Sequence, residues 1–178
     1  MTEIRIIDEK NKADINIPNE PFRVFGRVEP SRTDGVWGYD VKRFDEGDVS
    51  EMCFPDENYD FDKMKNDGFF FIGAYEDGKC VGLAVLQKGF FKYMYLYDLK
   101  VCSAYRGKHI GKLLVEKSRG VAKENGYCGL YTIGQDNNVP ACLFYLGTGF
   151  RIGGLDTDVY KHTKQEGKAD IIFYSECD

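Results

Sequence analysis

The chain has 178 residues, a length that suits one domain spanning residues 1–178 and burying about 70% of the surface of the unfolded chain. Hydrophobic residues make up 43% of the sequence and charged residues 30%, which is typical of a globular rather than a disordered protein. The net charge of −5 leaves no electrostatic footprint for nucleic acid or for an anionic membrane, so we expect neither partner.

The six cysteines have no Cys-x-x-Cys spacing, and the sequence shows neither a secretory leader nor a long apolar run. We therefore expect a cytoplasmic protein with reduced, mostly buried thiols. His109 and His162 are the only histidines, so we expect no metal site. The oligomeric state, monomer or homodimer, is left open.

The first half of the chain is predicted to be rich in strands. Residues 3–7 and 22–28 alternate like strands, whereas residues 37–67 lack a clear period and are predicted to hold one or two short helices with loops. Residues 69–75 and 80–87 flank a tight turn containing Asp77-Gly78 and predict a β-hairpin.

The second half alternates strands with helices. A long strand is predicted over residues 93–101, followed by a helix whose apolar face runs from Ile110 to Ala122 and which ends at Asn125-Gly126. The remaining predicted elements are a buried strand at 128–133, a helix at 138–148 and strands at 150–152 and 169–174. This order predicts an α/β fold with a mixed, mostly antiparallel sheet and helices on both faces.

A basic turn, Tyr-Arg-Gly-Lys-His-Ile-Gly-Lys at residues 105–112, joins the strand at 93–101 to the helix that follows. The unpaired amides at a helix N-terminus can bind a pyrophosphate, and Gly107 and Gly111 allow close approach of the backbone. Positive charge around the turn comes from Arg106, Lys108 and Lys112. Taken alone, the segment is equally consistent with a tight, solvated connection, and it lacks the Gly-x-Gly-x-x-Gly spacing of dinucleotide sites.

A second segment runs from Asn138 to Phe150. Ala141 and Tyr145 fall on one face of the predicted helix, and Asn138 is placed as its N-cap or first-turn residue. On this evidence alone, an ordinary amphipathic helix with a buried tyrosine is the better description.

Together the two segments resemble the GNAT acyltransferase superfamily. Arg106 and Gly111 match its first signature, Gln/Arg-x-x-Gly-x-Gly/Ala, and residues 138–150 match the second, Asn…Ala…Tyr…Gly-Phe. His109 stands where the family has its middle glycine. The resemblance implies a GNAT-like fold that binds acetyl-CoA as cosubstrate.

Further segments are similar to streptothricin acetyltransferases, and these matches span most of the chain. They lie at residues 19–22, 25–27, 37, 97–101, 135–142 and 153–160. That family acetylates an amine on the β-lysine arm of a cationic antibiotic. The resemblance therefore implies an N-acetyltransferase acting on a primary amine of a small cationic acceptor, with streptothricin, and so antibiotic resistance, as the leading candidate. Tyr97 departs from the family pattern, which has an acidic residue beside Asp98.

The resemblance also implies roles for individual residues. Tyr145 is expected to be the general acid that protonates the CoA thiolate, and Asp98 to hold the acceptor cation or relay its proton. A backbone N–H near Leu99, at a bulge, is the expected oxyanion donor. The cofactor-binding residues are expected to be Leu99, Val101, Arg106, Gly107, Lys108, His109, Gly111, Lys112, Asn138 and Ala141. The acceptor-binding residues are expected to be Trp37, Asp98, Asp136, Asp156 and Asp158.

Several alternatives stay open. Asp98 is in alternation phase with Met94 and Leu96, which places a carboxylate on an apolar strand face, although an edge-exposed or salt-bridged Asp98 is also consistent with the sequence. Cys102 and Cys142 are expected to pack rather than to act as nucleophiles. A protein or peptide amine acetyltransferase, or an acyl-CoA-binding sensor without turnover, would carry the same two motifs.

Overall fold

The computed structural model describes residues 2–89 and 91–177. Its contacts divide the chain into two compact units, each assembled from separate stretches of sequence. Unit 1 consists of Met1–Glu20, Phe54–Leu130 and Glu176–Asp178, and unit 2 of Pro21–Cys53 and Tyr131–Ser175. The single domain expected for the whole chain stays a prediction.

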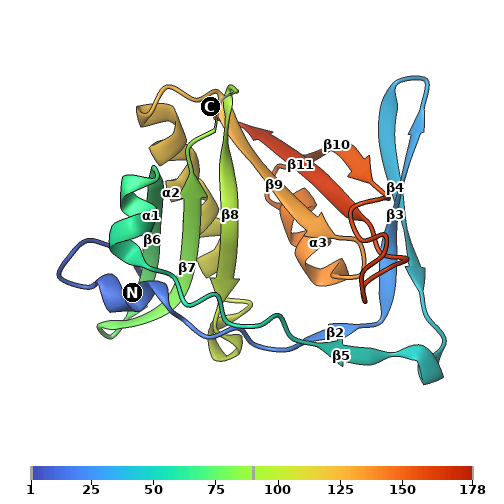
Figure 1. Cartoon of the computed structure of the whole chain (residues 1–178), viewed down its shortest axis with the longest axis horizontal. Coiled ribbons are helices and arrows are strands. Elements are labelled where there is room, and N and C mark those ends of the chain that lie inside the picture. The colour runs from blue at the N-terminus through green and yellow to red at the C-terminus, as the bar shows by residue number, and fades with distance from the viewer. Residues whose placement is uncertain (1, 90, 178) are drawn as a thin grey trace. The chain divides into compact units, whose positions relative to one another are not determined.

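Unit 1 contains four strands in the order β1-β6-β7-β8, and neighbouring strands are antiparallel. Figure 1 shows β6, β7 and β8 side by side. Their bounds are β1 (Glu3–Ile6), β6 (Phe69–Glu76), β7 (Lys79–Gln87) and β8 (Tyr93–Val101). The predicted hairpin is confirmed as β6 and β7. Its turn residues Asp77 and Gly78 have φ values of 50° and 78°, as a two-residue hairpin turn that follows the strand twist requires.

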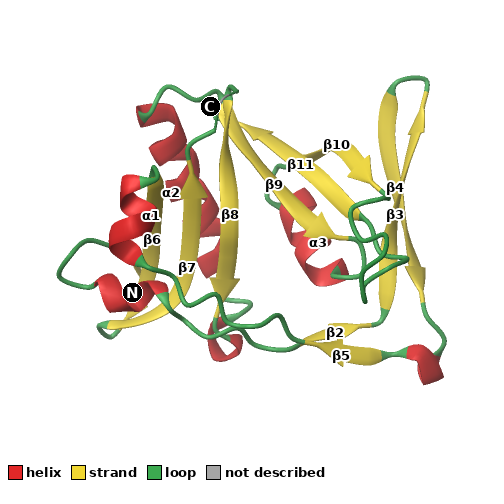
Figure 2. Cartoon of the chain, viewed as in Figure 1, coloured by secondary structure: helices red, strands yellow, loops and turns green. Residues whose placement is uncertain are grey.

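Helices cover both faces of these strands, as predicted (Figure 2). The helical elements of unit 1 are η1 (Lys12–Ile15), α1 (Phe61–Asn66), η3 (Ser103–Tyr105) and α2 (Ile110–Glu124). The helix α2 packs closely on β7, since a Cβ added at Gly82 would lie 3.1 Å from Leu114 Cδ1 and 3.3 Å from Ile110 Cγ2. Asn125 ends α2, and Gly126 follows with φ of 81°, as its sequence predicts.

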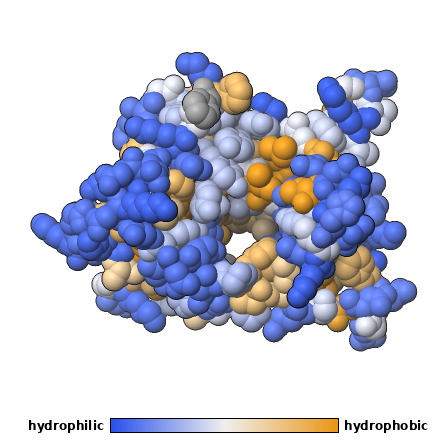
Figure 3. Space-filling view, in the orientation of Figure 1, coloured by the Kyte–Doolittle hydropathy of each residue, from blue (hydrophilic) through white to orange (hydrophobic). Residues whose placement is uncertain are grey.

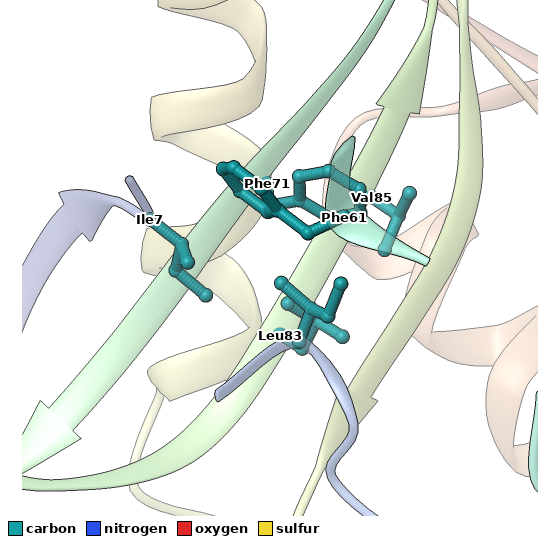
Figure 4. Close-up of a cluster of buried hydrophobic side chains, with 6 residues drawn as sticks. Ile7, Phe61, Phe71, Leu83 and Val85 are labelled. Carbon is teal, nitrogen blue, oxygen red and sulfur yellow. The ribbon is translucent and has the colours of Figure 1, made fainter. Parts of the chain in front are cut away.

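The opposite face of β6 and β7 carries a buried apolar cluster (Figure 4). Phe61 of α1 and Phe71 of β6 pack there with their ring centroids 5.4 Å apart. Leu83 and Val85 of β7 join them because alternate residues of a strand point to one face. Burial of each such side chain contributes about 1.5–3 kcal/mol, which fixes α1 on this face.

Unit 2 contains three strands in the order β9-β11-β10 and two separate antiparallel pairs, β2–β5 and β3–β4. The bounds are β2 (Phe22–Val24), β3 (Gly26–Thr33), β4 (Val36–Arg43), β5 (Ser50–Met52), β9 (Gly129–Gln135), β10 (Arg151–Asp156) and β11 (Asp170–Glu176). Its helical elements are η2 (Glu46–Asp48) and α3 (Val139–Gly147).

Two predictions for the amino-terminal part of unit 2 are wrong. The single strand expected at 22–28 is divided into β2 and β3, and a Cβ at Gly26 would collide with the carbonyl of Lys42. Residues 37–43, which belong to the region expected to hold short helices with loops, form most of the strand β4 instead. The turn before β4 is Asp34-Gly35, with φ values of 50° and 82°, the same signal that identified the β6–β7 hairpin.

The expected burial of thiols and of one strand also needs correction. Of the six free cysteines only Cys142 is buried, while Cys53 and Cys128 are exposed. Within the predicted strand at 128–133, Gly129, Leu130 and Thr132 are buried, but Ile133 is 39% exposed. Much of the face shown in Figure 3 is hydrophilic, in keeping with the large charged fraction of the sequence. Among the described residues, no helix is long and apolar enough to cross a membrane.

Candidate active site

A β-bulge in β8 determines where Asp98 points. Leu96 pairs with Leu86, and Asp98 pairs with Val85, so the intervening Tyr97 is the extra residue. Because Val85 and Leu86 are adjacent in β7, they face opposite sides of the sheet, and so do their partners. The prediction that Asp98 shares a face with Met94 and Leu96 is therefore wrong, since the bulge reverses the alternation.

On its own face Asp98 belongs to a polar network. Its Oδ2 accepts a hydrogen bond from Tyr59 Oη at 3.1 Å and pairs with Lys100 Nζ at 3.0 Å. Lys100 also donates to Glu57 at 2.7 Å and to Asn19 Oδ1 at 3.1 Å. The salt-bridged alternative for Asp98 is therefore confirmed.

The partners of Asp98 were not predicted. Lys100 could have been found, because residues two apart on a strand share a face. Glu57 and Tyr59 come from the segment before α1, which has no periodic pattern to place it.

The network holds two carboxylates and one cation. Burial raises the pKa of Asp98 above its ordinary value, and the nearby Glu57 adds to that effect while Lys100 opposes it. Burial alone would lower the pKa of Lys100, but Asp98 and Glu57 together raise it. Lys100 is therefore held charged at neutral pH, and with both carboxylates ionised the network has a net charge of about −1.

The bulge residue Tyr97 lies among other aromatic rings. Its centroid is 5.4 Å from that of Phe69, 5.6 Å from Tyr95 and 6.3 Å from Tyr59, all in edge-to-face geometry. The Tyr97 side chain is 44% exposed, so an aromatic surface borders the Asp98 network where an acidic residue was expected.

The turn before α2 has the backbone geometry of an anion site. Gly107 has φ of 77°, and His109, the N-cap of α2, is also left-handed, with φ of 62°. Histidine adopts the left-handed region more readily than most residues. His109, which stands where the family has a glycine, can therefore hold this left-handed backbone conformation. The His109 side chain does not cap the helix, which leaves the first-turn amides available to a ligand.

The three cations of the turn differ in their contacts. Arg106 donates to the carbonyl of Val101 at 3.1 Å and pairs with Glu20 at 3.3 Å, so it braces the turn against the end of β8. Lys108 Nζ lies 4.8 Å from the centre of the Tyr105 ring. Lys112 pairs weakly with Glu116 at 3.9 Å along α2.

In unit 2, α3 begins and ends as predicted. Asn138 is its N-cap, and the Asn138 Oδ1 accepts the N–H of Ala141 at 3.3 Å. Tyr145 is 8% exposed and packs against three phenylalanines, with centroids 5.4 Å from Phe150 and Phe173 and 5.7 Å from Phe144. The helix α3 therefore holds both Asn138 and Tyr145 in defined positions. The Tyr145 ring is part of the packed core, and the same side chain carries a hydroxyl group.

The predicted acidic residues of unit 2 have separate local roles. Asp136 is buried, with its carboxylate 3.5 Å from Arg27 Nε. Asp156 accepts the N–H of Asp158 at 2.9 Å, which closes a turn, and Asp158 pairs with Lys161 at 2.8 Å. Trp37 lies on β4, with its ring 5.9 Å from the Arg32 guanidinium.

One carboxylate of this region was missed. Asp170 is the cross-strand partner of Asp156 in β10–β11, and it accepts a hydrogen bond from Tyr160 Oη at 2.7 Å. Burial raises the pKa of Asp170, and the charges of Asp156 and Asp136 raise it further. The strand register therefore places Asp156 opposite Asp170, a proximity that the linear sequence does not reveal. Asp136 is near enough for its charge to raise the pKa of Asp170.

Neither cysteine considered as a nucleophile is activated. Burial raises the pKa of Cys142 to about 12. Burial and Glu20 also raise the pKa of Cys102. Both thiols are therefore neutral at pH 7, as expected of packing residues.

The site residues thus form two local groups. In unit 1, β8 carries Asp98, Leu99 and Val101 and leads directly into the turn at 106–112. In unit 2, Asp136 precedes the cap of α3, and the helix carries Ala141 and Tyr145.

Comparisons with known proteins identify the family of this chain. A model of the acetyltransferase (GNAT) family matches residues 38–150. Streptothricin acetyltransferase A of Bacillus subtilis (strain 168) is 34% identical over 164 residues, covering 92% of this chain and 94% of that protein. An Escherichia coli streptothricin acetyltransferase is 27% identical over 90% of this chain and 79% of its own length.

Solved structures agree. A candidate streptothricin acetyltransferase from Bacillus anthracis, crystallised with acetyl coenzyme A, superposes with a TM-score of 0.87 at 27% identity and covers 100% of this chain and 99% of its own. A nourseothricin acetyltransferase, at 22% identity and TM-score 0.79 over 99% of each chain, shares the fold. The predicted α/β fold with a mixed sheet is thereby confirmed. The chain therefore belongs to the acetyltransferase (GNAT) family and is an N-acetyltransferase that uses acetyl-CoA as its cosubstrate.

Proposed function

We propose that this enzyme acetylates a primary amine of a small cationic acceptor, with streptothricin as the leading candidate. The observation that carries the proposal is the excess of carboxylate over cation around Asp98, where Glu57 and Asp98 share the single ammonium of Lys100. A network of this charge attracts one further cation. Two of the relatives described above are named streptothricin acetyltransferases, which suggests that this further cation is streptothricin.

The acidic residues of unit 2 support the same acceptor class. Asp136 pairs with Arg27, whereas Asp170 accepts a hydrogen bond from Tyr160 and has its pKa raised by the charges of Asp156 and Asp136. We propose that the predicted acceptor residues Asp136, Asp156, Asp158 and Trp37 favour a polycationic acceptor by charge and by aromatic contact. A neutral or acidic acceptor would gain nothing from this arrangement.

Acetyl transfer requires a neutral amine. An alkyl ammonium with pKa near 10.4 costs about 4–5 kcal/mol to deprotonate at pH 7. We propose that Asp98 receives the ammonium proton, through water, before the neutral nitrogen attacks the thioester carbon. A second N–H proton leaves the nitrogen after the attack and returns to Tyr145 through solvent, once Tyr145 has protonated the thiolate. The raised pKa of Asp98 suits a proton acceptor better than that of an ordinary aspartate.

Collapse of the tetrahedral intermediate breaks the carbon–sulfur bond and leaves a thiolate. We propose that the Tyr145 hydroxyl protonates this thiolate. An amide of the β8 bulge near Leu99 is proposed to stabilise the oxyanion, since a bulge frees a backbone donor from the ladder.

The remaining predicted cofactor residues are proposed to bind acetyl-CoA. The uncapped start of α2 is suited to the pyrophosphate, and the exposed cations of the turn add attraction. The residues so assigned are Leu99, Val101, Arg106, Gly107, Lys108, His109, Gly111, Lys112, Asn138 and Ala141.

A screen of acceptors monitored by mass tests the proposal. The protein would be incubated with acetyl-CoA and, separately, with streptothricin, a polyamine, an aminoglycoside and a peptide with a free amine. We expect release of CoA thiol and a gain of about 42 Da on streptothricin, the mass of one acetyl group. Acetylation of the peptide alone would contradict the proposal and favour a protein or peptide acetyltransferase. Acetyl-CoA binding without turnover on any of these amines would favour the sensor.

A further inference from the structure

Two neighbouring residues of unit 1, Asn19 and Glu20, each contact a different part of the site, and neither is among the residues assigned above. Both residues are half-buried, in the segment that precedes β2 in the chain. Asn19 contacts the network around Asp98, whereas Glu20 contacts the turn that leads into α2.

Asn19 joins the cation of this network to one of its carboxylates. Its Oδ1 accepts a hydrogen bond from Lys100 Nζ at 3.1 Å, and its Nδ2 donates to Glu57 Oε1 at 2.9 Å. The same Nδ2 donates to the carbonyl of Pro55 at 2.8 Å, which fixes the plane of the amide. Because the Lys100 side chain is only 11% exposed, these bonds help to set where its ammonium lies between the two carboxylates.

Glu20 holds the start of the turn. Its Oε2 accepts the backbone N–H of Ser103 at 2.6 Å and pairs with Arg106 at 3.3 Å, and its Oε1 accepts the Ser103 hydroxyl at 3.3 Å. Arg106 also donates to the carbonyl of Val101 at 3.1 Å. The short η3 segment is therefore tied at both ends, by bonds to a charged carboxylate that are stronger than neutral ones.

The charge of Glu20 opposes any direct contact with the cofactor. A carboxylate repels a pyrophosphate, so by charge alone the loss of Glu20 should strengthen the binding of CoA. Its bonds to Ser103 and Arg106 act in the opposite direction, because they hold the backbone that leads to the free amides of α2. The two effects differ in sign, so an experiment can separate them.

One peptide bond joins these two sets of contacts. The Cα atoms of neighbouring residues lie about 3.8 Å apart, so Asn19 and Glu20 keep their partners at a defined separation. Those partners, Lys100 near the end of β8 and Ser103 at the start of η3, lie on one stretch of chain. Acyl transfer requires the amine nitrogen and the thioester carbon to approach to about 3–3.5 Å, so a small displacement of either part lowers the rate.

We propose that Asn19 and Glu20 are positioning residues that place the acceptor and the cofactor relative to each other. Asn19 acts on the acceptor through Lys100 and Glu57, and Glu20 acts on CoA through Ser103 and Arg106. The inference rests on the proposed function, which assigns the Asp98 network to the acceptor and the turn to the pyrophosphate.

Calorimetry with CoA tests the role of Glu20. We expect Glu20→Ala to raise the Kd for CoA roughly 10-fold, the effect of losing a hydrogen bond to a charged group. Glu20→Gln keeps an oxygen for the Ser103 N–H and removes the repulsive charge, so it should bind CoA at least as tightly as the wild type. The control Glu124→Ala, at an exposed position of α2, should stay within about two-fold. A Glu20→Ala variant that binds CoA as tightly as the wild type, or more tightly, overturns the proposal for Glu20.

Steady-state kinetics test the role of Asn19. We expect Asn19→Ala to raise KM for streptothricin roughly 10-fold while the Kd for CoA stays within about two-fold. Asn19→Ser, whose hydroxyl is too short to bridge Lys100 and Glu57, should behave in the same way and replaces Asn19→Ala if that variant does not fold. Asn66→Ala, at an exposed position of α1, is the matched control and should change neither constant. An unchanged KM, or an equal loss of affinity for CoA and acceptor, overturns the proposal for Asn19.

The outcomes also separate this proposal from the proposed function. Calorimetry with CoA needs no acceptor, so the result for Glu20 stands whether or not streptothricin is acetylated. A wild-type enzyme that acetylates another amine of the screen contradicts streptothricin as the acceptor, and Asn19→Ala is then measured with that amine. A wild-type enzyme that acetylates streptothricin, with both positioning variants behaving like their controls, overturns the positioning role and leaves the proposed function intact.

Discussion

The Lys100 ammonium lies 3.0 Å from the Asp98 carboxylate and 2.7 Å from that of Glu57. One cation thus pairs with two acids that come from different parts of unit 1. The side chains of Lys100 and Asp98 are only 11% and 17% exposed, so water cannot replace the missing partner if one is removed.

Removal of this cation should destabilise the fold. We expect Lys100→Met to lower the free energy of unfolding at pH 7 by about 3 kcal/mol, because it leaves two partly buried carboxylates without a cation. Denaturant unfolding would measure the loss. The control Lys42→Met, which breaks an exposed contact of 3.9 Å with Glu29, should cost less than about 1 kcal/mol. Adding Asp98→Asn to Lys100→Met should restore part of the stability, and a fully additive double variant would contradict this account.

The pH dependence of acetyl transfer should report Asp98. Burial raises its pKa above 3.8, so lowering the pH protonates this carboxylate before an ordinary aspartate, and the acidic limb of kcat/KM should lie above that value. For stability the sign is opposite. The unfolded chain ionises first as the pH rises, so the contribution of Asp98 to the free energy of unfolding falls as the pH rises from the unfolded pKa to the higher folded pKa. Rate profiles of the wild type and Asp98→Asn would check this. Survival of the same acidic limb in the variant would exclude Asp98 as its source.

Removal of the Tyr145 hydroxyl should impair chemistry and spare binding. We expect Tyr145→Phe to lower kcat about 10²–10⁴-fold, the usual contribution of a general acid, with little change in the Kd for CoA. The ring keeps its contacts with Phe150 and Phe173, so the fold should persist. Steady-state kinetics and calorimetry would measure both effects, with Tyr39→Phe at an exposed site of β4 as the control. A normal kcat would assign Tyr145 to packing alone.

The left-handed backbone of His109 should be relieved by glycine. The left-handed conformation costs a residue with a side chain about 1–2 kcal/mol. The greater conformational entropy of glycine in the unfolded chain offsets about half of the gain from removing this cost. We therefore expect His109→Gly to raise the free energy of unfolding by about 0.5–1 kcal/mol. Thermal unfolding would measure the gain. His162→Gly is a close control, since His162 has φ of 63° and should gain similarly. Only His109→Gly should alter CoA affinity, and equal effects of both variants on that affinity would argue against a role for the turn.

Local signals in the sequence predicted many elements of the fold. Asp77-Gly78 identified the hairpin, the apolar spacing of α2 identified its buried face, and Asn138 was placed correctly as a cap. The strand β4 was missed although Asp34-Gly35 carries the same turn signal, because most of β4 is exposed and lacks the alternation that marks a strand.

The site was harder to predict because its partners are distant in sequence. Strand alternation placed Asp98 on the wrong face, since one inserted residue, Tyr97, reverses the pattern and leaves no mark in composition. The contact of Tyr59 with Asp98 arises from tertiary packing, and the pairing of Asp156 with Asp170 arises from the register of two strands. No periodicity within a segment encodes such contacts.

The β3–β4 hairpin also supplies a spectroscopic probe. Trp37 is the sole tryptophan of the sequence, and its indole is half-buried beside the Arg32 guanidinium. Tryptophan fluorescence of the native enzyme therefore comes from Trp37 alone and reports on the β3–β4 hairpin without an engineered label. Quenching or a spectral shift during titration with an antibiotic would show that the hairpin senses the incoming molecule.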